Sequence, residues 1–311
     1  MAIAGIITTA SHPKALWPGV KEWWGRMYNE HAEEWKDLVF QDKSEQNFED
    51  DVQVVGFGLV PVKAQTTGTA YDSEIQGFTT RYIHLTYSLG YIVSLEELED
   101  NLYEKVSRTR SSSLAFSFHQ TKENVVAGMF NNGFSTATTP FVTGDNVSLF
   151  NTAHPNTSGG TFSNMLAVGA DLTETSLEDL LIQIMQATDD RGNLISLMAE
   201  SLHIAPQEWF NANRIVKSVF QSGTTNNDIN VLKATNAIPQ GIKMNHYFTS
   251  PHAWFIRTNV SGGTGLKFYQ RIEISFTQDN DFDTDNAKAK SRERYSVGCT
   301  DPRAVYASNG P

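Results

Sequence analysis

The chain has 311 residues, of which 40% are hydrophobic and 19% charged, so it can bury a substantial core and wholesale disorder is excluded. Its 24 basic against 35 acidic residues leave a formal charge of −11. That balance disfavours a general nucleic-acid binder, because phosphate neutralisation needs clustered Lys and Arg.

The length exceeds the size at which one core usually stops growing, which predicts two packed lobes. The single cysteine, Cys299, cannot form an internal disulfide and favours a reducing cytoplasm. No stretch approaches the roughly 18 apolar residues that span a bilayer, so we expect no membrane partner.

The N-terminal part of the chain combines two patterns. Residues 1–20 contain scattered Pro and Gly, which predicts an extended arm. Apolar residues then recur at spacings of three and four from Val20 to Phe40, which predicts an amphipathic helix carrying Trp23, Trp24 and Trp35. Core packing and docking on another subunit both explain this aromatic face.

A long hairpin is predicted from Val52 to Ser94. Strict alternation from Tyr82 to Ser94 indicates a strand of about 13 residues, against a usual length of about 5 or 6. One set of side chains is Ile83, Leu85, Tyr87, Leu89, Tyr91 and Val93, and the set that alternates with it is Tyr82, His84, Thr86, Ser88, Gly90 and Ile92. The expected partner strand is Val52 to Ala64, with a polar tip from Gln65 to Gly77.

This hairpin is too long to bury itself in one globule. Such a strand spans roughly 40 Å, whereas a chain of this length has a radius of gyration of about 20 Å. A projecting ribbon exposes unpaired edges, and neighbouring copies would cover them. The alternative is a conventional sandwich. The expected intersubunit contacts are Gln65, Thr67, Gly68, Tyr71 and Glu74 on the tip and Trp23, Trp24 and Trp35 on the helix.

Helices and strands mix in the rest of the chain, which predicts an α+β fold. Ser94 and Glu97 form a capping-box pattern for a long helix ending at Gly133, with Ser111 to Ser113 as a candidate interruption. Residues 135–169 are predicted to be loop. Beyond them we expect helices at Thr175–Asp189 and Pro206–Gln221, and strands at Ser196–Ile204, Ile229–Leu232, Tyr247–Arg257, Leu266–Phe276 and Arg292–Val297.

The sequence lacks the stronger catalytic signatures, so we assign no catalytic, cofactor-binding or metal-binding residue. Asp279, Asp281, Asp283 and Asp285 have the spacing of calcium-loop ligands. However, Thr284 replaces the required Gly and Lys290 the bidentate Glu, which favours a solvated acidic turn.

Two single residues and one basic row are weaker candidates. Cys299 is interpreted as a small buried residue and His154 as part of a turn. Lys288, Lys290, Arg292 and Arg294 alternate along one strand face and could meet phosphate, although pairing with acidic neighbours is the favoured reading.

The order of short motifs resembles the major capsid protein of tailed bacteriophages, and within it the Mu-type major head subunit. The motifs are Gly144 to Pro155 (GDNVSLFNTAHP), Ile204-Ala205-Pro206, Asn227 to Val231, Ala253-Trp254-Phe255, Arg294 to Gly298 and Asp301-Pro302-Arg303.

The resemblance implies an HK97-like capsid fold and a structural, non-enzymatic role. It places an N-terminal arm at 1–50, an E-loop at 51–93, a P-domain at 94–169 and 263–311, and an A-domain at 170–262. Hexamers and pentamers of the chain would close an icosahedral shell around double-stranded DNA, which is bound non-specifically. Portal and scaffolding or decoration proteins would be partners, and assembly would occur in the cytoplasm of the bacterial host.

Two alternatives remain open from the residues. One is an encapsulin-like nanocompartment shell, which encloses cargo enzymes instead of DNA. The other is a cytoplasmic enzyme whose site is built from loops around His154 and Asp145.

Overall fold

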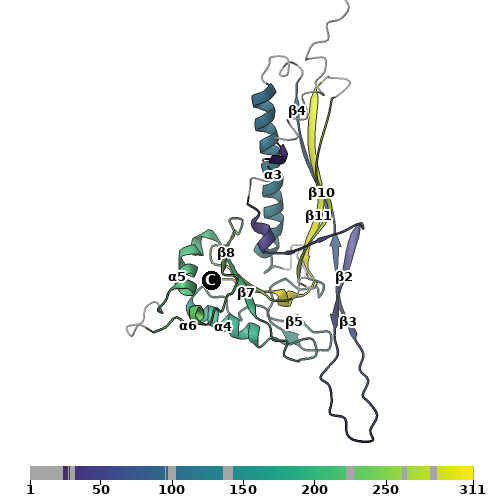
Figure 1. Ribbon diagram of the computed structural model, residues 1–311, viewed down its shortest axis with the longest axis vertical. Coiled ribbons are helices and arrows are strands. Elements are labelled where there is room, and N and C mark those ends of the chain that lie inside the picture. Colours follow the sequence, from purple (N-terminus) through teal and green to yellow (C-terminus); the bar gives the residue numbers. More distant parts are fainter. Residues whose placement is uncertain are drawn as a thin grey trace, which may run out of the picture. The chain divides into compact units, whose positions relative to one another are not determined.

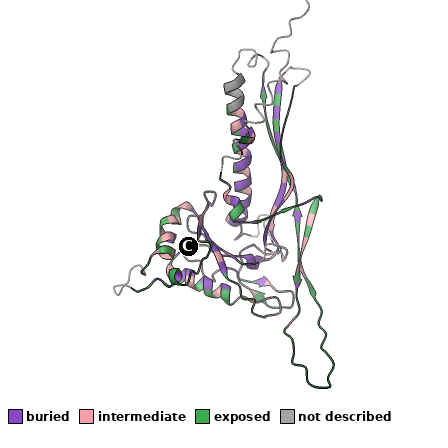
Figure 2. Cartoon of the chain, viewed as in Figure 1, coloured by how far each residue is buried: buried purple, intermediate pink, exposed green. Residues whose placement is uncertain are grey.

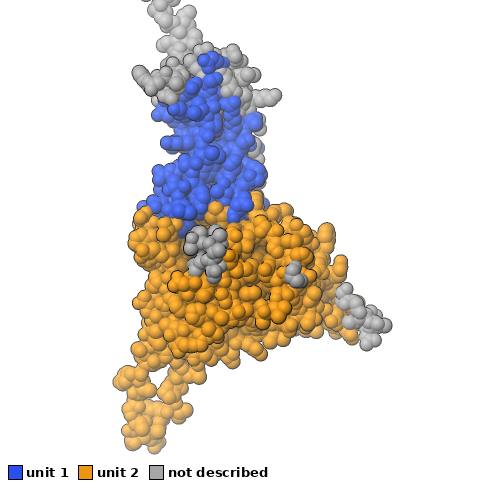
Figure 3. Space-filling model, turned by 180° about the vertical axis from the view of Figure 1, so that it is seen from behind, with its two compact units in different colours: residues 1–33, 84–124, 270–296 blue, residues 34–83, 125–269, 297–311 orange. Residues whose placement is uncertain are grey.

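The chain divides into two compact units (Figure 3). Unit 1 comprises residues 1–33, 84–124 and 270–296, and unit 2 comprises residues 34–83, 125–269 and 297–311. The structure is a computed structural model. It describes residues 24–26, 28, 32–94, 96, 103–135, 143–221, 228–260, 265–280 and 286–310, with backbone only for 103–108. Two units agree with the two lobes predicted from chain length.

Figure 1 labels the elements of an α+β fold. The helical elements are η2 (Glu34–Asp37), α3 (Tyr103–Asn131), α4 (Glu174–Met185), η3 (Pro206–Glu208), α5 (Trp209–Lys217), α6 (Val231–Ala234) and η4 (Pro302–Ala304). The strands are β1 (Phe40–Lys43), β2 (Phe48–Val55), β3 (Ile75–Ile83), β4 (Leu85–Val93), β5 (His154–Pro155), β6 (Thr161–Phe162), β7 (Ala199–Ile204), β8 (Ile242–Met244), β9 (Trp254–Thr258), β10 (Leu266–Asn280), β11 (Ala287–Cys299) and β12 (Val305–Ser308).

Unit 1 packs the first part of α3 against a sheet in which β10, β11 and β4 are neighbours. Leu114 and Phe118 of α3 are buried with Trp24, and the same cluster includes Phe276 of β10 and Ala289 of β11. Trp24 stacks on Phe276 with ring centroids 5.5 Å apart. The aromatic N-terminal segment therefore fills the core of its own unit.

Helix α3 runs without a break through Ser111 to Ser113, so the predicted interruption does not occur. Ser111 is fully buried. The helix ends at Asn131, two residues before the predicted Gly133, and the capping residue Glu97 lies outside the described residues. Within the described part of the chain, no helix combines the length and apolar composition that a bilayer span requires.

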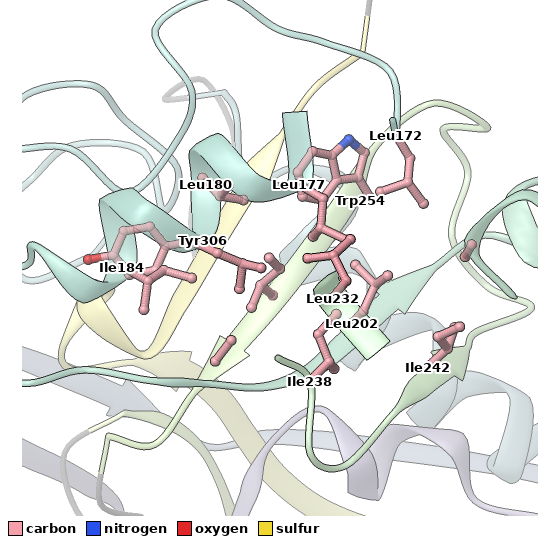
Figure 4. Close-up of a cluster of buried hydrophobic side chains, with 14 of the residues drawn as sticks. Leu172, Leu177, Leu180, Ile184, Leu202, Leu232, Ile238, Ile242, Trp254 and Tyr306 are labelled. Carbon is pink, nitrogen blue, oxygen red and sulfur yellow. The ribbon is translucent and has the colours of Figure 1, made fainter. Parts of the chain in front are cut away.

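The core of unit 2 forms around the sheet β12-β9-β7-β8 (Figure 4). Strands β7 and β8 are parallel, whereas β9 pairs antiparallel with both β7 and β12. Trp254 of β9 and Leu202 of β7 are fully buried in the same cluster as Leu177 of α4. A capping box starts α4: Thr173 Oγ1 accepts a hydrogen bond from the Ser176 N–H at 3.1 Å, and Ser176 Oγ accepts one from the Thr173 N–H at 2.9 Å.

The predicted hairpin pairing is wrong. Residues 82–94 do not form one strand, because the chain changes partner at His84: β3 pairs with β2, and β4 pairs with β11. The real hairpin is β2 and β3 joined by a loop of residues 56–74, in place of a partner strand to Ala64 and a tip at 65–77. Both pairings are antiparallel, so the alternating pattern alone could not distinguish them.

The alternation is real, but its buried face is inverted at the change of partner. Tyr82 is 2% exposed and His84 3%, whereas Ile83 and Leu85 are 62% and 51% exposed. Hydroxyl and imidazole groups can be buried when they are hydrogen-bonded. His84 Nδ1 lies 2.9 Å from Ser296 Oγ.

Three other predictions fail locally. The helix to Phe40 is interrupted, because residues 32 and 33 are not helical, η2 is a single 3-10 turn and β1 starts at Phe40. The strand at Ile229–Leu232 is replaced by α6, whose N-terminus is capped by the Asn230 side chain accepting from the Lys233 N–H. The strand from Tyr247 shortens to β9.

Candidate assembly interface on the hairpin

The loop of residues 56–74 carries large apolar side chains in solvent (Figure 2). Leu59 is 83% exposed, Val60 94%, Val62 99% and Tyr71 95%. Figure 3 shows the loop standing out from the rest of unit 2. Folded monomers rarely expose such an apolar group without a partner for it.

Local sequence explains why this segment is not a strand. Gly56 and Gly58 follow Val55 directly, and Pro61 cannot donate to a strand ladder. Thr66 adopts a left-handed φ of 70°, which turns the chain at the far end of the loop. In a strand, the side chains of this segment would point alternately to two faces. In the irregular loop they are all exposed to solvent instead.

The tip residues predicted as contacts lie in this loop. Gln65, Thr67, Gly68, Tyr71 and Glu74 are all exposed. The structure does not test their contact with another copy.

The predicted tryptophan contacts lie elsewhere. Trp24 is 7% exposed in the core of unit 1, and Trp35 is 3% exposed against Phe268 of unit 2, with ring centroids 4.5 Å apart. Core packing therefore accounts for both indoles, and neither offers surface to another subunit. Trp23 lies outside the described residues.

Sequence reasoning missed Phe57, Leu59, Val60 and Val62, which it placed in a strand. The run Gly-Phe-Gly-Leu-Val-Pro-Val contains two Gly and one Pro within seven residues. That composition was the available signal for an irregular apolar loop.

The root of the hairpin is anchored by a buried polar network in unit 2. Asp51 of β2 accepts hydrogen bonds from Lys267 Nζ and, at 2.5 Å, from Thr300 Oγ1. Tyr82 Oη of β3 lies 2.7 Å from the same Thr300 hydroxyl. Burial raises the pKa of Tyr82, so its phenol stays neutral. Both strands of the hairpin are thus tied to one buried point.

Two glycines allow the chain to pack closely on β3. A Cβ at Gly298 would lie 2.8 Å from the Tyr82 ring, and one at Gly144 would lie 2.7 Å from Thr80 Oγ1. Both distances are shorter than carbon contacts allow. The hairpin root is therefore fitted tightly into unit 2, while the loop beyond it remains free of such packing.

The His154 and Asp145 pair exists but is closed to solvent. His154 Nδ1 lies 2.6 Å from Asp145 Oδ2, and the two side chains are 0% and 4% exposed. His154 Nε2 lies 3.2 Å from Asn164 Oδ1 and its ring stacks on Phe162. Both ring nitrogens are engaged by buried neighbours, so no substrate can reach the imidazole and the pair is structural.

The structure also places Cys299 and the row of basic residues that the sequence singled out. Cys299 is buried, burial raises the pKa of its thiol, and Sγ lies 3.2 Å from the carbonyl oxygen of Asp301. Lys288, Lys290 and Arg292 lie exposed on β11, and Arg294 Nε donates to the His84 carbonyl.

No group of metal-ligating residues is found among the described residues. Asp281, Asp283 and Asp285 lie outside them, so the predicted acidic turn stays a prediction.

Comparison with known proteins identifies what this architecture is similar to. Residues 77–308 match the family model described as phage capsid protein. No curated protein sequence matches the chain.

Solved structures of low sequence identity share the fold. A Mycobacterium phage Patience chain has a TM-score of 0.54 at 11% identity, covering 98% of this chain and 89% of that one. The capsid of Myoviridae phage XM1 has a TM-score of 0.52 at 10% identity, covering 88% and 90%. The virus-like particle from Pyrococcus furiosus has a TM-score of 0.51 at 12% identity, covering 93% and 98%. The fold is that of HK97-like capsid proteins, as the sequence resemblance implied.

Proposed function

This chain belongs to the phage capsid protein family, and we propose that its β2–β3 hairpin joins copies of the chain into an icosahedral shell. As a member of that family it is a structural protein of the virion capsid. The observation that carries the proposal is the loop of residues 56–74, which exposes large apolar side chains while its root is anchored in unit 2.

Closed self-assembly supplies a partner for such a loop. Every copy presents the same loop, so a contact on a neighbouring copy covers all loops when the shell closes. The same subunit forms hexamers and pentamers in the proposed shell. The contacts that we assign to the loop are Gln65, Thr67, Gly68, Tyr71 and Glu74, together with Leu59, Val60 and Val62.

The proposed domain assignment follows the capsid fold. It comprises an N-terminal arm at 1–50, an E-loop at 51–93, a P-domain at 94–169 and 263–311, and an A-domain at 170–262. The hairpin supports the E-loop assignment, since its strands span 48–55 and 75–83. Most of the unit 2 core cluster lies between Leu172 and Ile256, which supports the A-domain.

The partners beyond other copies are portal and scaffolding or decoration proteins, with assembly in the cytoplasm of the host. Double-stranded DNA is the proposed content of the shell. A net charge of −11 is compatible with enclosing DNA without specific binding, since counterions screen charges more than about 8–10 Å apart. A kinship with Mu-type head subunits is proposed from the motif order between Gly144 and Arg303.

Shortening the loop tests the function. Replacing residues 59–70 by a short Gly-Ser linker spares Gly58, Asp72 and Ser73 at the root and all of β3. We expect a folded, soluble subunit that no longer forms shells, because the exposed contacts Leu59, Val60 and Val62 are gone. Sedimentation velocity and negative-stain microscopy would measure this. Shells of normal size and yield from this variant would refute the proposal.

The particle contents distinguish two kinds of shell. Nucleic acid protected from nuclease inside purified particles supports the proposed capsid. Cargo protein in its place would identify an enzyme-enclosing compartment.

A further inference from the structure

The root of the hairpin loop is joined to a turn elsewhere in unit 2. Arg191 Nη1 donates to Asp72 Oδ2 at 2.8 Å, and Nη2 donates to the Ser73 carbonyl at 2.6 Å. The Gly58 N–H donates to the same Asp72 oxygen at 2.8 Å. One guanidinium therefore holds the returning arm of the loop, and Asp72 joins that arm to the outgoing one.

The turn that carries Arg191 is rigidly built. Asp189 Oδ1 accepts hydrogen bonds from the N–H groups of Arg191 and Asn193, both at 2.8 Å. Gly192 adopts a φ of 84°, a conformation that a side chain would strain. Local hydrogen bonds thus fix the backbone from which the Arg191 side chain leaves.

The same turn is fastened to the interior of unit 2. Asp190 Oδ1 accepts from Arg303 Nη2 at 2.7 Å, and both side chains are 3% exposed. Asp190 Oδ2 accepts from Thr157 Oγ1 at 2.9 Å. Removing one partner of a buried ion pair strongly destabilises a protein, so this pair holds the turn firmly in place. The side chains of these two adjacent residues point in opposite directions: Asp190 points into unit 2, and Arg191 points to the hairpin loop.

Apart from the contacts of Arg191 and Asp72, few hydrogen bonds orient the hairpin loop relative to the rest of unit 2. Its other hydrogen bonds in the structure are local, such as that from the Thr67 N–H to the Ala64 carbonyl at 3.3 Å. Hydrogen bonds from the Gly58 and Ser73 N–H groups hold the pKa of Asp72 below its ordinary value, and Arg191 adds to this. The carboxylate is therefore charged at neutral pH and available to the guanidinium.

We propose that Arg191 is a positioning residue that holds the hairpin loop in the orientation in which it contacts a second copy. The inference rests on the proposed function of the loop. In the held state Leu59, Val60, Val62 and Tyr71 all face solvent, so the contact presents these side chains without covering them. Preorganisation of this kind reduces the ordering cost of association. Arg191 is 18% and Asp72 47% exposed, so the bias toward the held orientation is modest, roughly tenfold or less.

The test compares Arg191→Ala with Arg214→Ala, which removes an exposed cation of α5 in the same unit. Hydrogen exchange is measured on unassembled subunits below the assembly concentration. We expect peptides covering 57–74 to exchange several-fold faster in Arg191→Ala and unchanged in Arg214→Ala. Equal exchange in wild type and Arg191→Ala would overturn the proposal, whatever the outcome of the loop deletion.

Assembly provides the second readout. We expect Arg191→Ala to raise the concentration needed for shells by up to about tenfold, with the unfolding midpoint unchanged. Arg191→Lys should restore part of the lost assembly. Its ammonium group can pair with Asp72, but it cannot donate to Asp72 and to the Ser73 carbonyl with the planar geometry of a guanidinium. Asp72→Ala should show an effect of similar or larger size, because it also removes the acceptor of the Gly58 N–H, and the double variant should lose less than the sum of the two single variants. Faster loop exchange with unaltered assembly would show that the contact does not position the loop for docking.

Discussion

At the residue scale, hydrogen bonds fix the arrangement of the buried pair His154 and Asp145. Asn164 Nδ2 donates to the carbonyls of Leu149, Pro302 and Val305, and its Oδ1 accepts from the Asn151 N–H. The amide orientation is thereby settled, so His154 Nε2 faces an acceptor. Nδ1 faces the Asp145 carboxylate. Each ring nitrogen of His154 therefore faces a buried oxygen, and the pair is held in one arrangement.

Asp145→Asn should therefore destabilise the subunit by about 2–3 kcal/mol at pH 7, because the buried His154 ring loses its carboxylate partner. Burial opposes ionisation of Asp145, but hydrogen bonds from His154 and Thr143 outweigh it and lower its pKa. A lowered pKa contributes stability above the unfolded value of about 3.9, and this is lost as pH falls through the folded pKa. The difference between variant and wild type should thus vanish in acid, as measured by urea unfolding.

Asp171→Asn is the matched control. Asp171 pairs with His252 at 3.0 Å, and both side chains are 50% exposed. An exposed pair contributes about 1 kcal/mol or less. If both Asn variants lost the same stability at pH 7, burial of the His154 pair would have no energetic consequence and the prediction for Asp145→Asn would fail.

At the element scale, β11 has two chemically opposite faces. Ala287, Ala289, Ser291, Glu293 and Tyr295 are buried, while the residues between them are charged or polar and mostly exposed. Glu293 meets Lys122 of α3 at 2.9 Å, and Lys122 Nζ also donates to Tyr28 Oη at 3.0 Å. Helix and strand in unit 1 are thus joined by a buried ion pair.

Lys122→Met should leave a buried carboxylate without its counter-charge. Burial raises the pKa of Glu293, and loss of Lys122 removes the charge that opposes this rise. A raised carboxyl pKa favours the folded state at low pH, and stability falls as pH rises from the unfolded value of about 4.3. We expect almost no loss near pH 4 and about 3–5 kcal/mol at pH 8 in urea unfolding.

The double variant Lys122→Met, Glu293→Leu should restore most of this stability, since no unpaired charge remains. Lys290→Met on the exposed face of β11 is the control and should change stability by no more than about 0.5 kcal/mol. A pH-independent loss in Lys122→Met would show that packing, and not the charge of Glu293, dominates the interface.

At the scale of the whole molecule, the role that we propose for the exposed loop is the association of copies. Val60 and Val62 are 94% and 99% exposed on each subunit. Burying one valine against a neighbour contributes about 1.5 kcal/mol. A symmetric shell repeats that contribution at every contact, so small changes in the loop have large effects on assembly.

Replacing Val60 and Val62 by Ser should weaken each contact by about 3 kcal/mol, or roughly 100-fold. The folded subunit should be unaffected, because neither side chain contacts its interior. Sedimentation as a function of concentration measures the loss. Val168→Ser, at a site 81% exposed elsewhere in unit 2, tests whether any lost apolar surface has the same effect. Assembly of the double variant at the wild-type concentration would contradict the assignment of the loop.

Periodicity and local turn chemistry made much of the fold predictable. The end of α3 near Gly133, the start of α4 near Thr175, the strands β7 and β10 and the mixed α+β class all follow from spacings within one segment. The mostly irregular backbone of residues 143–169, interrupted only by β5 and β6, follows in the same way. These are short-range properties, because helix spacing, caps and Gly or Pro act within a few residues.

The sequence by itself therefore determined that a strand starts near Val52 and that residues 82–94 alternate as strands do, and it predicted that copies of the chain associate. Only the tertiary structure decided that β3 joins β2 while β4 joins β11, that Tyr82 and His84 face inward, and that Trp24 and Trp35 belong to the core. It also brought Arg191 to Asp72 across 119 positions of the chain. Strand alternation has the same period whatever the partner, and which distant segments meet depends on packing that no local pattern records.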